Sequence, residues 1–115
     1  MPIRLKQVRK LSVGATSDYI TVNLTDDLDG AESVSSGTVN GFIVGSSTGI
    51  TFGAVSATTG TYIERDTMAT VAAGAAMRFS VSATTSVSKG MRVIEVSFST
   101  SARGPLTREL AFEVV

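Results

Sequence analysis

The chain has 115 residues, the length of one compact domain. It contains neither cysteine nor histidine, which excludes disulfides, the usual zinc sites and histidine-based catalysis. Ten Lys and Arg residues balance ten Asp and Glu residues, and a net charge of zero gives no support to a nucleic-acid or membrane partner.

The composition favours β-strands over helices. Ser and Thr supply 30 residues and Gly another 11, whereas Leu, Lys and Glu, which favour helices, are scarce. An apolar fraction of 43% is enough material for a hydrophobic core. The first residues carry no apolar run like that of a signal peptide, and no stretch reaches the length of a membrane span. We therefore expect an ordered domain that is made in the cytoplasm.

The N-terminal part of the chain predicts a basic lead-in to the domain. A first strand is expected within residues 3–13, where the alternation of apolar and polar residues slips between Leu5 and Val8. Residues 1–15 are therefore interpreted as a basic arm or first strand, and residues 16–115 as the folded domain.

The next two strands are separated by an acidic turn. Residues 18–24 alternate strictly between apolar and polar side chains, which predicts a strand with one buried face. The Asp-rich segment 25–30 predicts a turn closed by glycine, with Leu28 packed beneath it. A third strand is predicted over residues 32–44, with an interruption near residues 35–37.

The middle of the chain predicts short strands and one ambiguous segment. Alternation continues through residues 50–54, and residues 62–63 form another short apolar stretch. Residues 67–77 are rich in alanine, and Asp66 or Thr67 would cap a helix there. Gly74 interrupts this segment and strands flank it, so a helix is the less favoured alternative.

The C-terminal part predicts three more half-buried strands, over residues 77–81, 91–100 and 110–114, with a turn at residues 101–105. About seven or eight short antiparallel strands, with turns roughly every 8 to 12 residues, are typical of a single immunoglobulin-like β-sandwich. The residues expected to form its core are Ile20, Val22, Phe42, Phe52, Phe79, Ile94, Phe98 and Phe112.

A cluster of basic residues near the N-terminus predicts a binding surface. The first ten residues contain four basic side chains and no acid, whereas residues 18–32 contain five acids and no base. Attraction between opposite charges can set how the copies of an assembly align. We therefore expect the arm to reach an acidic patch on a neighbouring copy. Solvation of both segments is the alternative. The candidate partner-binding residues are Arg4, Lys6, Arg9, Lys10 and Tyr62, the last because tyrosine often anchors interfaces.

The acidic turn is a weak candidate for a metal site. Alternating carboxylates can wrap a calcium ion, and Asp26, Asp27, Asp29 and Glu32 have this character. The segment lacks the closing acid of the twelve-residue calcium loop, and hydrogen bonds from Asp side chains to the turn backbone explain the same residues. We expect no metal and no cofactor.

No arrangement of residues predicts catalysis. Serine and threonine are abundant, but no histidine or cysteine is present to form a catalytic pair. Ser88 and Lys89 are adjacent, and neighbours on a strand point to opposite faces. The sequence therefore predicts a protein that is not an enzyme and has no small-molecule substrate.

Two segments resemble a known protein family. Residues 18–30, DYITVNLTDDLDG, followed by Ser33 to Ser36, and the C-terminal stretch 94–114 with its FSTS run, Gly104 turn and Arg108, resemble the fiber-tail adaptors of tailed bacteriophages. That resemblance implies an immunoglobulin-like fold and a structural role in the virion, linking tail or neck to fibres.

The resemblance also implies partners and a location. The expected partners are other copies of the chain and neighbouring virion proteins, with neither nucleic acid nor membrane involved. The protein would be made in the host cytoplasm and reside in the virion. A capsid decoration or cement protein, and a surface- or glycan-binding module with the same fold, are the alternatives.

Overall fold

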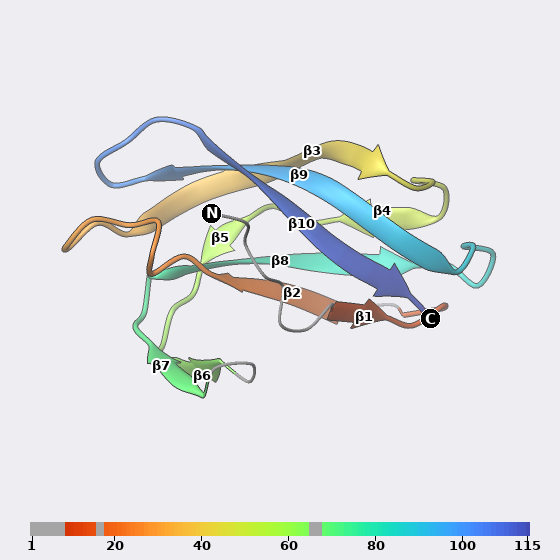
Figure 1. The fold of residues 1–115 in the computed structure, drawn as a ribbon, viewed down its shortest axis with the longest axis horizontal. Helices are drawn as coiled ribbons and strands as arrows, with labels where there is room; N and C mark the ends of the chain where they lie inside the picture. The colour runs from red at the N-terminus through yellow and green to blue at the C-terminus, as the bar shows by residue number, and fades with distance from the viewer. Residues whose placement is uncertain (1–8, 16–17, 65–67) are drawn as a thin grey trace.

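The structure is a computed structural model that describes residues 9–15, 18–64 and 68–115. These residues form two packed β-sheets, from which a small hairpin projects (Figure 1). The strands are β1 Arg9–Leu11, β2 Asp18–Asn23, β3 Val34–Val44, β4 Ile50–Phe52, β5 Ser56–Ala57, β6 Tyr62–Glu64, β7 Ala69–Val71, β8 Ala76–Ala83, β9 Gly90–Thr100 and β10 Leu106–Val114. The described part of the chain contains no helix long and apolar enough to cross a membrane.

The order of the strands is that of an immunoglobulin-like sandwich. One sheet has the order β1-β10-β9-β3, and the other has the order β2-β8-β4, with β5 also pairing with β8. In immunoglobulin nomenclature, β3, β9 and β10 are strands C, F and G, and β2, β8 and β4 are strands B, E and D. The all-β sandwich predicted from the sequence is therefore confirmed. The described residues form ten strands because the central region is divided into short pieces.

The first strand departs from an all-antiparallel arrangement. β1 lies parallel to β10, with Arg9 opposite Phe112 and Leu11 opposite Val114. Parallel neighbours need a long crossover between them, and here the whole domain supplies that connection. Leu11 is 2% exposed, so β1 also contributes to the core.

The core lies between the two sheets and follows the predicted alternation. Five of the eight predicted core residues are buried, and the other three are partly buried and pack against the same cluster. Phe52 of β4 contacts the rings of Phe42, Phe79 and Phe112, with ring centroids 5.6, 5.9 and 6.3 Å away. Because these three rings come from both sheets, Phe52 joins the two layers.

The alanine-rich segment forms a hairpin strand and a turn, so the helical alternative is wrong for its described residues. Val71 is 1% exposed and pairs with Tyr62 across the β6–β7 hairpin. Gly74 has a φ of 80°, which glycine adopts without strain, and its carbonyl accepts a hydrogen bond from the Val34 amide at 2.9 Å. A buried β-branched residue and this turn favour extended backbone.

Candidate functional site

The acidic turn between β2 and β3 lies against the loop between β9 and β10, at one end of the sandwich (Figure 1). Leu24, which is fully buried, anchors the turn, because its carbonyl accepts hydrogen bonds from the amides of Asp27 and Leu28 at 2.8 and 3.1 Å. Leu28 packs partly buried against the core, as the sequence predicts. The core therefore anchors the turn from beneath, and of its acidic side chains Glu32 contacts the β9–β10 loop through Arg103.

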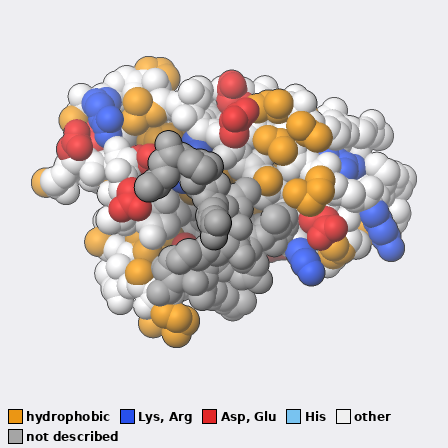
Figure 2. Space-filling model, in the orientation of Figure 1, with side chains coloured by type: hydrophobic (Ala, Val, Ile, Leu, Met, Phe, Trp, Pro, Cys, Tyr) orange, Lys and Arg blue, Asp and Glu red, His pale blue; other side chains and the backbone are white. Residues whose placement is uncertain are grey.

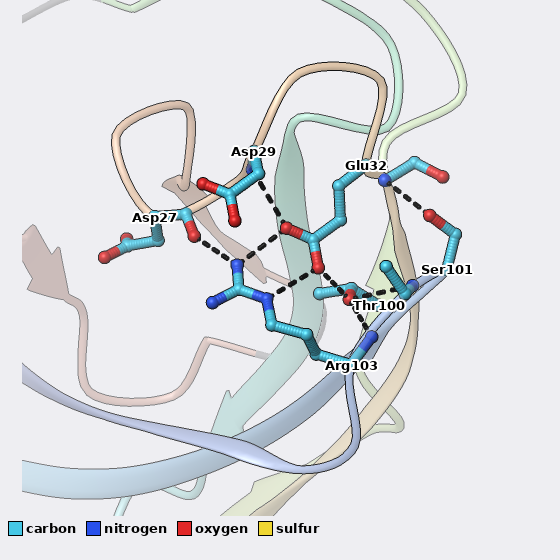
Figure 3. A network of polar contacts seen from close by, with 8 residues as sticks. Asp27, Asp29, Glu32, Thr100, Ser101 and Arg103 are labelled. Atoms are coloured by element: carbon cyan, nitrogen blue, oxygen red, sulfur yellow. Dashed lines mark hydrogen bonds and ion pairs between the residues drawn. The ribbon is translucent and has the colours of Figure 1, made fainter.

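Glu32 is the centre of a polar network that joins it to Arg103, Thr100 and Asp29 (Figure 3). Arg103 donates from Nε to Oε2 at 2.8 Å and from Nη2 to Oε1 at 2.6 Å. The Thr100 hydroxyl donates to Oε2, and the Asp29 amide donates to Oε1 at 2.9 Å. Although Arg103 is partly exposed, the Glu32 side chain is only 2% exposed, so this is a sheltered, fork-shaped ion pair.

The network shifts the ionisation of both partners. Hydrogen bonds from Arg103, and then from Thr100 and the Asp29 amide, lower the pKa of Glu32 to about 2. The same hydrogen bond to Glu32 raises the pKa of Arg103. Charge on Glu32 is thus stabilised at all ordinary pH values, and the carboxylate acts as a clamp between two loops.

The other acids of the turn do not converge with Glu32 into a metal site. Asp27 forms an ion pair with Arg108, and its backbone carbonyl accepts a hydrogen bond from Arg103 Nη2 at 2.5 Å. Asp26 and Asp29 are exposed. Across the described residues, no group of three or more acids is placed to hold a metal ion. The calcium interpretation therefore gains no geometric support. Two of the four candidate carboxylates, those of Asp27 and Glu32, form ion pairs with arginines instead.

A buried arginine holds the loops at the opposite end of the sandwich. Arg92 of β9 is 3% exposed. Its Nε donates to the Ser46 carbonyl at 2.8 Å, and its Nη2 donates to the Ser88 carbonyl and hydroxyl at 2.7 and 2.9 Å. The guanidinium therefore ties the β3–β4 loop to the β8–β9 loop.

A shallow groove of about 300 Å³ lies on the outer face of the second sheet. Tyr19 and Arg78 line it, with the guanidinium carbon 3.8 Å from the centre of the tyrosine ring. The side-chain oxygen of Thr58, which also lines the groove, is buried without a hydrogen-bond partner. Most of the remaining wall consists of small hydroxyl and alanine side chains.

Apart from Tyr19 in the groove and the last residue, Val115, the exposed large apolar side chains of the described residues lie in two places. Ile43 and Val44 at the end of β3, and Met91 on β9, are 49, 48 and 44% exposed. On the β6–β7 hairpin, Ile63 and Met68 are 59 and 75% exposed. Figure 2 shows hydrophobic side chains gathered between acidic ones over the region of β9 and β10. These surfaces lie outside the core that closes the sandwich.

The predicted partner-binding residues fall into three groups. Arg4 and Lys6 lie outside the described residues, and no structure is assigned to them here. Arg9 and Lys10 belong to β1, where Lys10 is exposed and lies opposite Glu113. Tyr62 is half-buried in β6, and its hydroxyl donates a hydrogen bond to Glu64 at 3.4 Å. The structure does not gather the described ones into one site.

Sequence reasoning did not find the two arginine clamps. Arg103 is 71 positions from Glu32, and Arg92 is 46 positions from Ser46. The only local signal for Arg92 is its place on the inward-facing side of an alternating strand, between Gly90 and Ile94. Arg103 stands in a turn, where an arginine is ordinary.

The comparisons with known proteins give no relative for this chain. No protein-family model matches the sequence, and searches of curated proteins and of solved structures find no significant match. The resemblance to phage fiber-tail adaptors therefore stays a prediction.

Proposed function

We propose that the chain is a structural component of a tailed-phage particle, an adaptor that links tail or neck to fibres through contacts with other copies and with neighbouring virion proteins. The observation that carries this proposal is the pair of exposed apolar surfaces, on β3 with β9 and on the projecting hairpin. Exposed apolar groups in a folded protein favour association, since burying them releases water. The alternative, a decoration or cement protein of the capsid, would also bind its neighbours by burying exposed apolar groups.

Mass spectrometry of purified particles tests the role in the virion. In particles of the phage that encodes the chain, we expect its peptides at a copy number comparable to that of other minor structural proteins. Their absence from particles, together with their presence in the lysate of infected cells, would contradict the proposal.

The predicted role of the basic arm has its own test. Removing residues 1–8 leaves β1, and with it Leu11, in place. We expect the shortened chain to fold and to assemble less completely than the full chain. Equal assembly by both chains would show that Arg4 and Lys6 do not bind a neighbour.

The groove beside Tyr19 favours one second candidate, a glycan-binding module. Hydroxyl-bearing side chains, a tyrosine ring and the Arg78 guanidinium are groups that contact sugars through hydrogen bonds and stacking. A glycan array with the wild-type chain and with Arg78→Ala distinguishes the two functions. Binding that is lost in the variant would favour the module, and no binding would favour the virion building block.

A further inference from the structure

We propose that β3 is the self-association edge of the sandwich, and that a second copy pairs its own β3 antiparallel to residues 38–44 across a two-fold axis. This inference rests on the proposed function, for which it names the contact between copies. It combines a free backbone edge, the absence of charge on that edge, and an adjoining apolar patch.

The first observation is the free edge itself. β3 pairs with β9 on one side, and on its other side Val55 bridges to it only at Gly37, with the Val55 amide 3.2 Å from the Gly37 carbonyl. No described residue pairs with the far side of residues 38–44. Figure 1 shows β3 at the margin of its sheet. Unpaired backbone groups in such an edge are ready to accept another strand.

The second observation is that β3 lacks the charges that guard the other edges. β3 has 11 residues and contains no charged residue and no proline. The other edge strands, by contrast, are short or charged: β4 has three residues, β1 has three including Arg9 and Lys10, and β2 begins with Asp18. Charged side chains and short length are among the means by which proteins keep edges from pairing; of the other means, β3 has bulges after Val39 and after Phe42.

The third observation is the apolar patch at the end of the same strand. Ile43 and Val44 are each nearly half exposed, and Val44 lies opposite Val93 of β9 in the sheet. Met91 extends the exposed apolar surface along β9. A partner strand beside β3 would cover part of this patch, and an uncharged apolar partner suits it best.

A second copy of the chain meets these requirements. Its β3 is equally uncharged, and the irregularities in its pairing with β9, after Val39 and after Phe42, give it the same bend. With residues 38–44 fully overlapped, the two-fold axis passes beside Gly41, and each apolar end meets the start of the other strand.

Cysteine at the proposed axis tests this geometry directly. The chain has no cysteine, so Gly41→Cys introduces one thiol, and an added Cβ at Gly41 meets no atom within 4 Å. Residues directly opposite in antiparallel strands lie about 5 Å apart, within reach of a disulfide. Gly104→Cys is the matched control, since its Cβ also meets nothing within 4 Å but lies in the β9–β10 loop.

After mild oxidation of each variant at equal concentration, non-reducing gels give the result. We expect Gly41→Cys to run mostly as a covalent dimer and Gly104→Cys to remain mostly monomeric. Equal dimer fractions in the two variants, or a monomeric Gly41→Cys, would overturn the proposal.

Charge on the edge gives an independent test by native mass in the full chain. Ile43→Lys places a cation beside the free edge, and we expect it to weaken self-association at least tenfold relative to the wild type. Met68→Lys places the same charge on the exposed hairpin, and we expect association to be unchanged. A wild type that associates equally well with either substitution uses another surface, and this would overturn the assignment of β3.

The two proposals can fail separately. A wild-type chain that stays monomeric overturns self-pairing by β3. Detection of the chain in purified particles would in that case still support the virion role, through contacts with other proteins alone.

Discussion

Glu32 makes the stability of the domain depend on acid pH. Its pKa is lowered from 4.5 to about 2 in the folded protein, so below pH 4.5 the unfolded chain binds more protons at this site than the folded one. The stabilisation from the clamp is complete above pH 4.5 and is lost as the pH falls toward 2. We expect urea midpoints of the wild type to fall more steeply over this window than those of Glu32→Gln. Parallel curves for the two proteins would contradict the role of Glu32.

Arg92 is the residue-scale anchor of the opposite end. Replacing it with methionine keeps much of the volume but leaves the Ser46 and Ser88 carbonyls without their donors. We expect Arg92→Met to lower the free energy of unfolding by about 2 to 3 kcal/mol. Arg92→Lys should lose less, because it keeps the charge but not the planar fork. Urea denaturation measures both, and a methionine variant as stable as the wild type would show that the clamp adds nothing.

At the scale of the elements, Phe52 joins β4 to both sheets. Its ring contacts Phe42 of β3, Phe79 of β8 and Phe112 of β10. We expect Phe52→Ala to lower the free energy of unfolding by about 3 kcal/mol, because it leaves a cavity between the layers.

The neighbouring Thr51 supplies the control for Phe52. It points away from the core and shares a hydrogen bond with Ser82 at 2.5 Å. Thr51→Ala should cost about 1 kcal/mol or less. Equal losses at positions 51 and 52 would mean that the aromatic cluster does not hold the layers together.

The elements also separate what the sequence could predict from what it could not. Alternation of period two marks a strand with one buried face, so β2, β8, β9 and β10 follow from local pattern alone. The pairing of β1 with β10 joins the two ends of the described chain, and no local pattern encodes a partner so distant. The Glu32–Arg103 clamp is hidden for the same reason, since both residues are ordinary in turns.

Exposed apolar residues limit prediction in a different way. The sequence has one apolar run at Phe42, Ile43 and Val44. Only Phe42 packs against the core, because the pairing of β3 with β9 shifts after this residue. A bulge changes which face a side chain occupies. The candidate contact surface therefore depends on a backbone irregularity that composition and spacing do not reveal.

At the scale of the whole molecule, the loops at the two ends of the sandwich are tied together, whereas its sides carry exposed apolar side chains. Arg103 and Arg92 fasten the loops at its two ends, whereas β3 and the β6–β7 hairpin carry the exposed apolar side chains. This division suits a rigid module that meets its neighbours sideways, as a component of a repeated assembly would.

The native mass of the full chain tests this account most directly. Size exclusion with light scattering over a wide range of concentration compares the mass in solution with the 11.9 kDa of one chain. The account predicts a defined multiple of that mass that persists on dilution and falls toward one chain in Ile43→Lys. A mass of one chain at every concentration would contradict the central claim that copies of this protein contact one another.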